Sequence, residues 1–247
     1  MKNLLYLFLL IPQLFLAQSD FEKGNELYRK NQYQEAVQAY ESVLKTQKHS
    51  AELYFNLGNA YYKLNKVAPA IYYFEKALLL NPNDKDILNN LAFAQKLQID
   101  EVKEVPEVGF GKLVSNLTSS QHYNSWAWMA VWASFGVLLF FIGYYFSYKT
   151  LLKRTYFGGM FIALIFLVLA IFFAMTEKNN ERMYRPAIVF DERVEIKSEP
   201  KPDASVAFYL HEGTKVEVKE NLDNWRLIAL PDGTKGWIRK NSIKELK

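Results

Sequence analysis

The apolar residues of this chain follow three patterns, and each pattern predicts a different kind of structure. Residues 18–98 repeat a helix–turn–helix pattern with a period of 34 residues. Residues 126–146 and 156–175 are apolar throughout and contain no charged side chain. From residue 187 onward, apolar and polar positions alternate in short runs, which is typical of strands. The sequence therefore predicts a multi-domain membrane protein with an all-α array, a two-helix transmembrane hairpin and a small all-β domain.

The helical array is read from an internal repeat. Residues 51–84 form one complete 34-residue unit, and the segment before it is a second copy. A shift of 34 residues aligns these pairs: Gly24 with Gly58, Asn25 with Asn59, Tyr28 with Tyr62, Asn31 with Asn65, Ala36 with Ala70, and Tyr40 with Phe74. The period, the small residues at repeat positions 8 and 20, the aromatic at position 24 and Pro82 at position 32 resemble the tetratricopeptide repeat, or TPR. The resemblance implies a stack of helix pairs that binds proteins, closed by a single helix over 85–98.

The TPR resemblance also implies a binding groove, because the first helices of such repeats line a concave face. The positions carried over to this sequence are Phe21, Asn25, Tyr28, Phe55, Asn59, Tyr62, Asn89 and Phe93. Some relatives grip a terminal carboxylate with basic residues, but Asp86 and Asn90 occupy two of those positions here. We therefore expect an aromatic groove with amide groups, suited to an extended or helical apolar segment. The alternative is that Tyr62 and Phe93 only pack against their neighbours.

The two long apolar runs each meet the requirement of about 20 apolar residues for a membrane helix. Tryptophans near one end of the first run and tyrosines near the other fit interfacial belts. Neither run contains Asp, Glu, Lys, Arg or His, which argues against a transporter or a pump. Residues 99–125 and 176–186 are expected to be linkers, and a candidate interfacial helix lies within 108–125.

Two signals predict the same membrane topology. Residues 1–17 carry one lysine and then an apolar stretch, which is typical of a secretory signal peptide cleaved before Gln18. Phe15 departs from the preferred small residue, so an uncleaved anchor is the alternative. The loop 147–155 contains Lys149, Lys153 and Arg154 and no acidic residue, which favours the cytoplasmic side. We therefore expect a multi-pass protein of a bacterial inner membrane, with both soluble domains in the periplasm.

The C-terminal region is predicted to hold five short strands, VEIKS, VAFYL, TKVEVKE, NWRLIAL and TKGWIRK, separated by proline and glycine turns. Over 187–247 the order of strands and turns resembles the bacterial SH3-like domain, with Trp225, Gly233, Gly236 and Trp237 at that family's motif positions. The resemblance implies a small barrel that binds peptides, often those of the cell wall. Tyr209 and Trp237 are the candidate ligand platform, whereas Trp225 is expected in the core.

Composition and motifs argue against catalytic activity, against metal or cofactor sites and against nucleic acid as a partner. There is no cysteine, which excludes disulfides, thiolate catalysis and cysteine zinc sites. The formal net charge of +4 is spread along the chain, which argues against nucleic acid as a partner. The three histidines, His49, His122 and His211, lie in separate segments without a partner at motif spacing. No phosphate-binding loop or hydrolase motif occurs, so we expect no cofactor, no metal and no enzymatic activity.

The order of signal peptide, TPR array, membrane hairpin and SH3-like barrel resembles the BatE family of the aerotolerance (Bat) operon in Bacteroidetes. The resemblance implies membrane proteins with von Willebrand A domains, a MoxR-type ATPase and other Bat proteins as neighbours, and a role in oxygen tolerance or envelope stress. The first hypothesis is therefore a scaffold. The second is a cell-wall sensor whose barrel binds peptidoglycan peptides, and a third, enzymatic, interpretation needs an activity that one polar substitution abolishes.

Overall fold

The computed structural model describes residues 20–101, 112 and 116–247 of the 247-residue chain. The predicted signal peptide lies outside these residues, as do 108–111 and 113–115 of the segment that holds the candidate interfacial helix. Contacts divide the chain into two compact units. One unit combines two distant segments, Met1–Glu104 and Arg185–Lys247, and the other is the segment Val105–Tyr184 between them.

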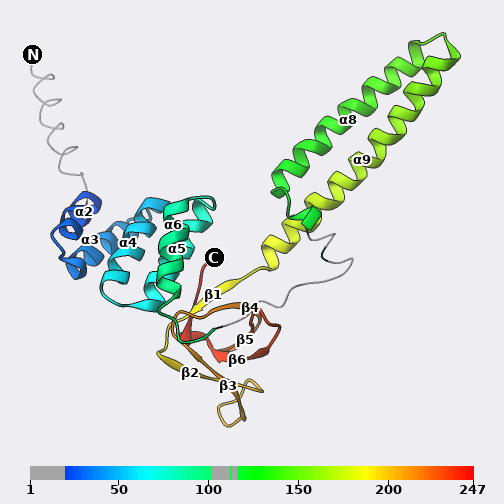
Figure 1. Cartoon of the computed structure of the whole chain (residues 1–247). Helices are drawn as coiled ribbons and strands as arrows, with labels where there is room; N and C mark the ends of the chain where they lie inside the picture. The colour runs from blue at the N-terminus through cyan, green and yellow to red at the C-terminus, as the bar shows by residue number, and fades with distance from the viewer. Residues whose placement is uncertain (1–19, 102–111, 113–115) are drawn as a thin grey trace, which may run out of the picture. The chain divides into compact units, whose positions relative to one another are not determined.

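Between residues 20 and 101, five helices form the helical region of the first unit (Figure 1). They are α2 (Asp20–Arg29), α3 (Tyr33–Lys45), α4 (Ala51–Lys63), α5 (Val67–Leu80) and α6 (Lys85–Gln95). Asn31 and Asn65, which the repeat aligns, stand just after α2 and α4 with φ angles of 59° and 57°. Asparagine tolerates this left-handed conformation better than most residues, so the same residue type turns the chain at the same point of each repeat.

Small residues let the paired helices approach closely. A Cβ atom added to Gly58 would lie 2.6 Å from a ring carbon of Phe74 on α5, and Gly24 faces the ring of Tyr40 on α3 in the same way. Phe74 and Tyr40 are almost completely buried. Gly58 therefore lies where the two helices touch, and the fit explains why glycine and an aromatic recur 16 residues apart in both repeats.

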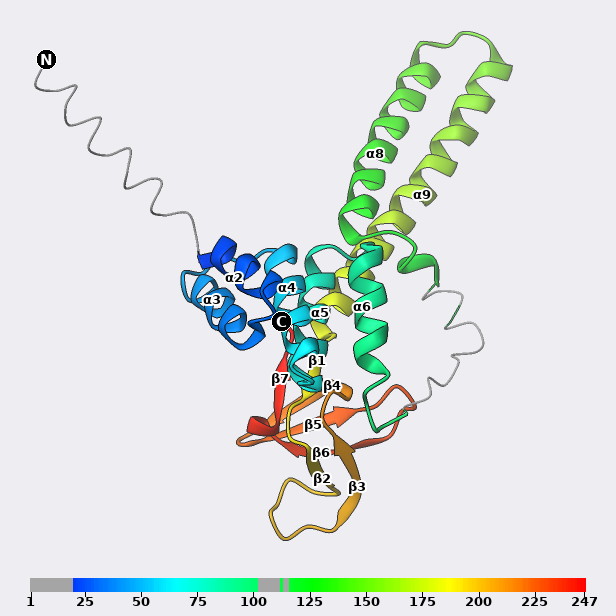
Figure 2. The ribbon, with the colours of Figure 1, turned by 60° about the vertical axis from the view of Figure 1, so that its left-hand side comes forward.

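The second unit contains two long apolar helices, α8 (Tyr123–Phe146) and α9 (Thr150–Met183), which run side by side (Figures 1 and 2). Both are long and apolar enough to cross a membrane, and most of their large apolar side chains are exposed. Gly143 faces Tyr156 and Gly159 faces Phe140, so each helix accepts a ring of the other. α9 extends eight residues past the predicted span 156–175 into the expected linker, because nothing in TEKNNERM breaks a helix.

The C-terminal segment forms a seven-stranded antiparallel sheet domain with the order β3-β2-β6-β5-β4-β1-β7. The strands are β1 (Pro186–Val189), β2 (Arg193–Lys197), β3 (Val206–His211), β4 (Lys215–Leu222), β5 (Trp225–Ala229), β6 (Lys235–Arg239) and β7 (Ile243–Glu245), with a short helix η1 (Lys240–Ser242) before β7. The prediction of five strands omitted β1 and β7. β1 is buried along its whole length, so it shows no alternation, and β7 has only three residues.

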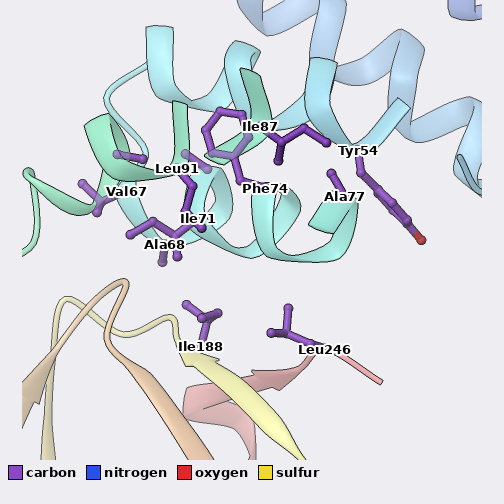
Figure 3. Close-up of a cluster of buried hydrophobic side chains, with 12 residues drawn as sticks. Tyr54, Val67, Ala68, Ile71, Phe74, Ala77, Ile87, Leu91, Ile188 and Leu246 are labelled. Carbon is purple, nitrogen blue, oxygen red and sulfur yellow. The ribbon is translucent and has the colours of Figure 1, made fainter. Parts of the chain in front are cut away.

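The helical region and the sheet domain share one hydrophobic cluster, which we call the joint (Figure 3). Ile188 from β1 and Leu246, which follows β7, are almost completely buried and point toward α5. Gly213, between β3 and β4, has a φ of 87°, and a Cβ there would lie 3.0 Å from Ile71 Cδ1. The sheet domain therefore packs directly on α5, and the two soluble regions form one folded piece.

Polar contacts surround the joint. The Asp100 carboxylate, just after α6, accepts hydrogen bonds from the His211 backbone N–H (2.6 Å), from His211 Nδ1 (2.8 Å) and from Thr214 Oγ1 (2.7 Å). Lys215 Nζ pairs with the buried Glu75 carboxylate at 2.8 Å. Burial alone would raise the pKa of Asp100, but the three hydrogen bonds together hold that pKa below its ordinary value of 3.8. Helix α6 is thus tied to the β3–β4 turn by a charged acceptor.

Candidate functional site

The helical region contains a cavity of roughly 390 Å³ on the side formed by the first helix of each repeat. Its lining residues come from α2, α4 and α6, and they are Tyr28, Asn59, Tyr62, Lys63, Asn90 and Phe93. We call this cavity the groove pocket. Residues 31 to 65 positions apart in the chain meet here because equivalent helices of successive repeats lie next to each other.

The groove pocket combines aromatic surface with amide groups and one cation. Asn90 Nδ2 donates to Asn59 Oδ1 at 2.8 Å, which joins α6 to α4 across the floor. In the described part of the chain, Asn59 Nδ2 and Asn90 Oδ1 have no further hydrogen bond, so a donor and an acceptor remain for a ligand. Phe93 is 52% exposed, and Lys96 Nζ lies 5.0 Å from its ring centroid. An apolar segment with main-chain hydrogen-bonding groups fits this chemistry.

A second cavity, of roughly 550 Å³, lies in the sheet domain. We call it the tryptophan pocket, and it is lined by Pro202, Asn224, Trp225, Arg239, Lys240 and Asn241. Trp225 at the start of β5 pairs in register with Arg239 at the end of β6. The guanidinium carbon of Arg239 stands 5.6 Å from the centroid of the Trp225 ring. The Lys240 backbone N–H donates to the Asn224 carbonyl oxygen at 2.8 Å, which fixes η1 beside the β4–β5 turn.

Comparison with protein families separates the two regions. Residues 24–65 match the family model described as TPR repeat, and residues 51–84 match the one described as tetratricopeptide repeat. Residues 191–245 match the bacterial SH3 domain. The chain joins TPR repeats to a bacterial SH3 domain. A search of curated proteins gave no match to the chain.

The structure brings four of the predicted groove residues together and places the other four elsewhere. Tyr28, Asn59, Tyr62 and Phe93 line the groove pocket of the TPR region. Phe21 packs against Tyr40, with ring centroids 5.9 Å apart, and Phe55 packs against Phe74 at the same distance. The remaining two are Asn25, whose Oδ1 accepts from Tyr40 Oη and Asn56 Nδ2, and Asn89, which is exposed on α6.

Lys63 and Asn90 line the groove pocket but were absent from the predicted set. Lys63 directly follows Tyr62, at the end of α4. Asn90 stands 31 residues after Asn59 rather than 34, so a strict repeat alignment pairs it with Asn56 instead. Its hydrogen bond to Asn59 matches that of Asn56 to Asn25, which also spans 31 residues. This 31-residue spacing of asparagines was the available signal.

The predicted ligand platform of the SH3 domain does not line the tryptophan pocket. Tyr209 is 43% exposed on β3, and the Arg193 guanidinium lies 4.0 Å from its ring centroid. Trp237 is half-buried on β6, where it pairs in register with Leu227 and Lys197. Trp225, expected in the core, is instead half-buried and forms a wall of the tryptophan pocket. It stands at the start of a strand, directly after the Asp223-Asn224 turn, where burial is incomplete.

The histidines occupy structural positions in the described residues. His49 Nδ1 bonds Tyr54 Oη at 2.7 Å, His122 Nε2 lies 3.8 Å from Glu181, and His211 belongs to the joint. Within the described ranges, no group of three or more His, Asp or Glu side chains is arranged to hold a metal ion. TPR and SH3 domains are typically non-catalytic. The two pockets are therefore candidate binding sites.

Proposed function

We propose that this protein is a non-enzymatic scaffold of the bacterial inner membrane, and that it presents its TPR region and SH3 domain in the periplasm to assemble partner proteins. The observation that carries the proposal is the groove pocket, where three helices contribute aromatic rings around a pair of amides. Such a surface fits an apolar segment in an extended or helical conformation, bound through its side chains and its main chain.

The joint supports a membrane hairpin with both soluble regions on one side. The TPR region precedes α8 in the chain and the SH3 domain follows α9, yet the two share a hydrophobic cluster. A chain that crosses a membrane between two contacting regions must return to the side it left, which requires an even number of crossings. Two spanning helices satisfy this requirement. The basic loop with Lys149, Lys153 and Arg154 then faces the cytoplasm, and both soluble regions face the periplasm.

The partners we propose follow from the resemblance to BatE. They are membrane proteins with von Willebrand A domains and other Bat proteins, and the process is aerotolerance or the response to envelope stress. A scaffold anchored in the same membrane as its partners raises their local concentration, so a groove of modest affinity suffices. Phe93 is exposed and ready for such contact without unfolding of the TPR region.

In-cell crosslinking followed by affinity purification and mass spectrometry tests the proposal. We expect Phe93→Ala together with Lys63→Glu to remove the crosslinked partners, because both side chains line the groove pocket and are exposed. The control is Leu80→Ala, since Leu80 is 54% exposed, close to the 52% of Phe93, but stands at the end of α5 outside the pocket. Unchanged partners in the groove variant would refute the binding role of this surface.

The second candidate is the cell-wall sensor, and the tryptophan pocket favours it because it gives the SH3 domain a ligand site of its own. The test is sedimentation of the purified full chain with isolated peptidoglycan. The isolated segment 187–247 is unsuitable, because it would expose Ile188 and Leu246. The sensor is supported if the wild-type chain sediments with peptidoglycan and a variant substituted at Trp225 does not. A wild-type chain that stays in the supernatant argues against the sensor.

A further inference from the structure

The charge of the tryptophan pocket is unbalanced. Arg239 and Lys240 both line it, and no aspartate or glutamate does. In the described chain neither cation lies within 4.0 Å of a carboxylate oxygen. Three other lysines of the SH3 domain each pair with a glutamate two positions earlier in the chain: Lys197 with Glu195, Lys201 with Glu199, and Lys219 with Glu217. Two positive charges are therefore available to a ligand in the pocket.

The walls of the pocket are held in place by the main chain. Asp223, in the β4–β5 turn, has a φ of 47°, and Arg226 Nη1 donates to its carbonyl oxygen at 3.1 Å and to that of Trp225 at 2.8 Å. Arg226 is itself buried. Together with the hydrogen bond from the Lys240 N–H to Asn224, these contacts fix the turn, Trp225 and η1 relative to one another. A fixed arrangement lowers the entropy that a ligand must lose.

The side chains of the pocket match a particular ligand chemistry. A guanidinium placed beside an indole ring offers two parallel N–H groups, which suit a planar carboxylate. Lys240 adds a second donor with a positive charge. The amides of Asn224 and Asn241 each offer a donor and an acceptor, which suits the peptide main chain, while Pro202 and Trp225 provide apolar surface. A cavity of roughly 550 Å³ falls in the range typical of sites for small ligands.

We propose that the tryptophan pocket binds a peptide through its free terminal carboxylate. Arg239 pairs with the carboxylate, Lys240 contributes the second positive charge, Trp225 packs against the terminal side chain, and the asparagine amides bond the peptide main chain. The site is separate from the groove pocket and from every residue of the joint. It therefore stands or fails independently of the scaffold function.

The test measures binding of fluorescently labelled tripeptides, Gly-Ala-Ala, to the full chain in nanodiscs of uncharged lipid by fluorescence anisotropy. The free acid is compared with the C-terminal amide, which has the same shape and no charge. We expect the free acid to bind at least tenfold more tightly, and Arg239→Gln to weaken its binding by about tenfold. Lys235→Gln is the matched control, because Lys235 is also exposed on β6 but does not line the pocket, and it should leave binding unchanged.

The outcomes separate the proposal from its competitors. Equal binding of acid and amide, or unchanged binding to the Arg239→Gln variant, would overturn the proposal, as would displacement of the peptide by inorganic phosphate at a lower concentration than by acetate. Lys240→Gln provides a second variant, expected to weaken binding and to reduce its dependence on salt. Preference for a terminal D-alanine would identify cell-wall peptides as the source, and preference for L-alanine would identify protein C-termini. Both preferences support a carboxylate site.

Discussion

Leu246→Ala should destabilise two regions that lie far apart in the sequence. Leu246 is 1% exposed and belongs to the cluster that the SH3 domain forms with α5. Its backbone N–H donates to the Pro186 carbonyl oxygen at 2.9 Å, and its own carbonyl oxygen accepts from Lys76 Nζ at 3.2 Å. The substitution keeps both main-chain bonds and removes only apolar contact. It therefore measures the apolar part of the joint.

The expected cost follows from the burial of the side chain. Truncation of a buried leucine to alanine costs about 2–5 kcal/mol in protein cores, and the value rises with the size of the cavity that remains. Leu246 follows β7, a three-residue strand at the edge of the sheet, so its surroundings collapse more easily than a central core site. We therefore expect a loss of about 2–3 kcal/mol, which corresponds to roughly a 30- to 160-fold increase in the equilibrium constant for opening.

Hydrogen exchange with mass spectrometry is the suitable assay, because it reports each segment separately. We expect faster exchange both in α5 and in β1, since opening the joint exposes surface on each side. Leu222→Ala is the control, because Leu222 is 44% exposed on β4 and should change stability by less than about 0.5 kcal/mol. Faster exchange confined to β1 and its neighbouring strands, with α5 unaffected, would show that the two regions are stable independently and would refute the reasoning.

Three further predictions concern single contacts. Gly58→Ala should lower the free energy of unfolding by about 1–3 kcal/mol, because the new Cβ would overlap Phe74. Gly158→Ala on α9 is the control, since its Cβ would meet open space and should not destabilise the protein. Equal effects of the two substitutions in a urea titration contradict the packing argument. Asp100→Asn should destabilise the protein at pH 7 but match the wild type in acid. A carboxyl whose pKa is lowered in the folded state adds stability above its unfolded pKa of 3.8, and this stability is lost as the pH falls through the folded pKa. A difference in urea midpoints that stays constant from pH 7 to 3 argues against this. Burial raises the pKa of Tyr40 to about 12, so stability from its neutral phenol is present below pH 10 and lost as the pH rises through 12. An absorbance titration at 295 nm in which every phenol ionises like free tyrosine, with none ionising at higher pH, contradicts this prediction.

The fold was predictable from the sequence where a pattern repeats. The 34-residue period located the TPR helices and aligned the glycine and the aromatic residue that pack together in each repeat, because each repeat solves the same packing problem. Uninterrupted apolar runs located the two long helices, and alternation located five of the seven strands. β1 was not predicted because both of its faces are buried, one inside the SH3 domain and one against α5. Its sequence therefore lacks the alternation of polar and apolar residues that marks a strand.

The contacts of the joint could not be predicted from local sequence patterns. Ile188 and Leu246 look like ordinary strand residues, and Asp100 looks like a solvated charge in a linker. Their roles depend on contacts between positions more than 100 residues apart, such as that of Asp100 with His211. The tryptophan pocket was missed for a similar reason. Pro202 lies between β2 and β3, Trp225 begins β5 and Lys240 begins η1, and only the fold of the sheet domain brings them together.

For the proposed scaffold function, the joint matters because it fixes the distance between the two candidate binding sites. Two binding modules on flexible tethers sample many separations, and the gain from binding one partner at both sites falls as the tether lengthens. Here the TPR region and the SH3 domain are fastened by buried apolar contacts, by the Glu75–Lys215 ion pair and by the bonds of Asp100. The groove pocket and the tryptophan pocket therefore keep a fixed separation. Under the proposed scaffold function, a partner with two contact segments at that separation would gain affinity from both pockets, whereas a partner with a different spacing would gain nothing. The joint would then select partners by geometry as well as by chemistry.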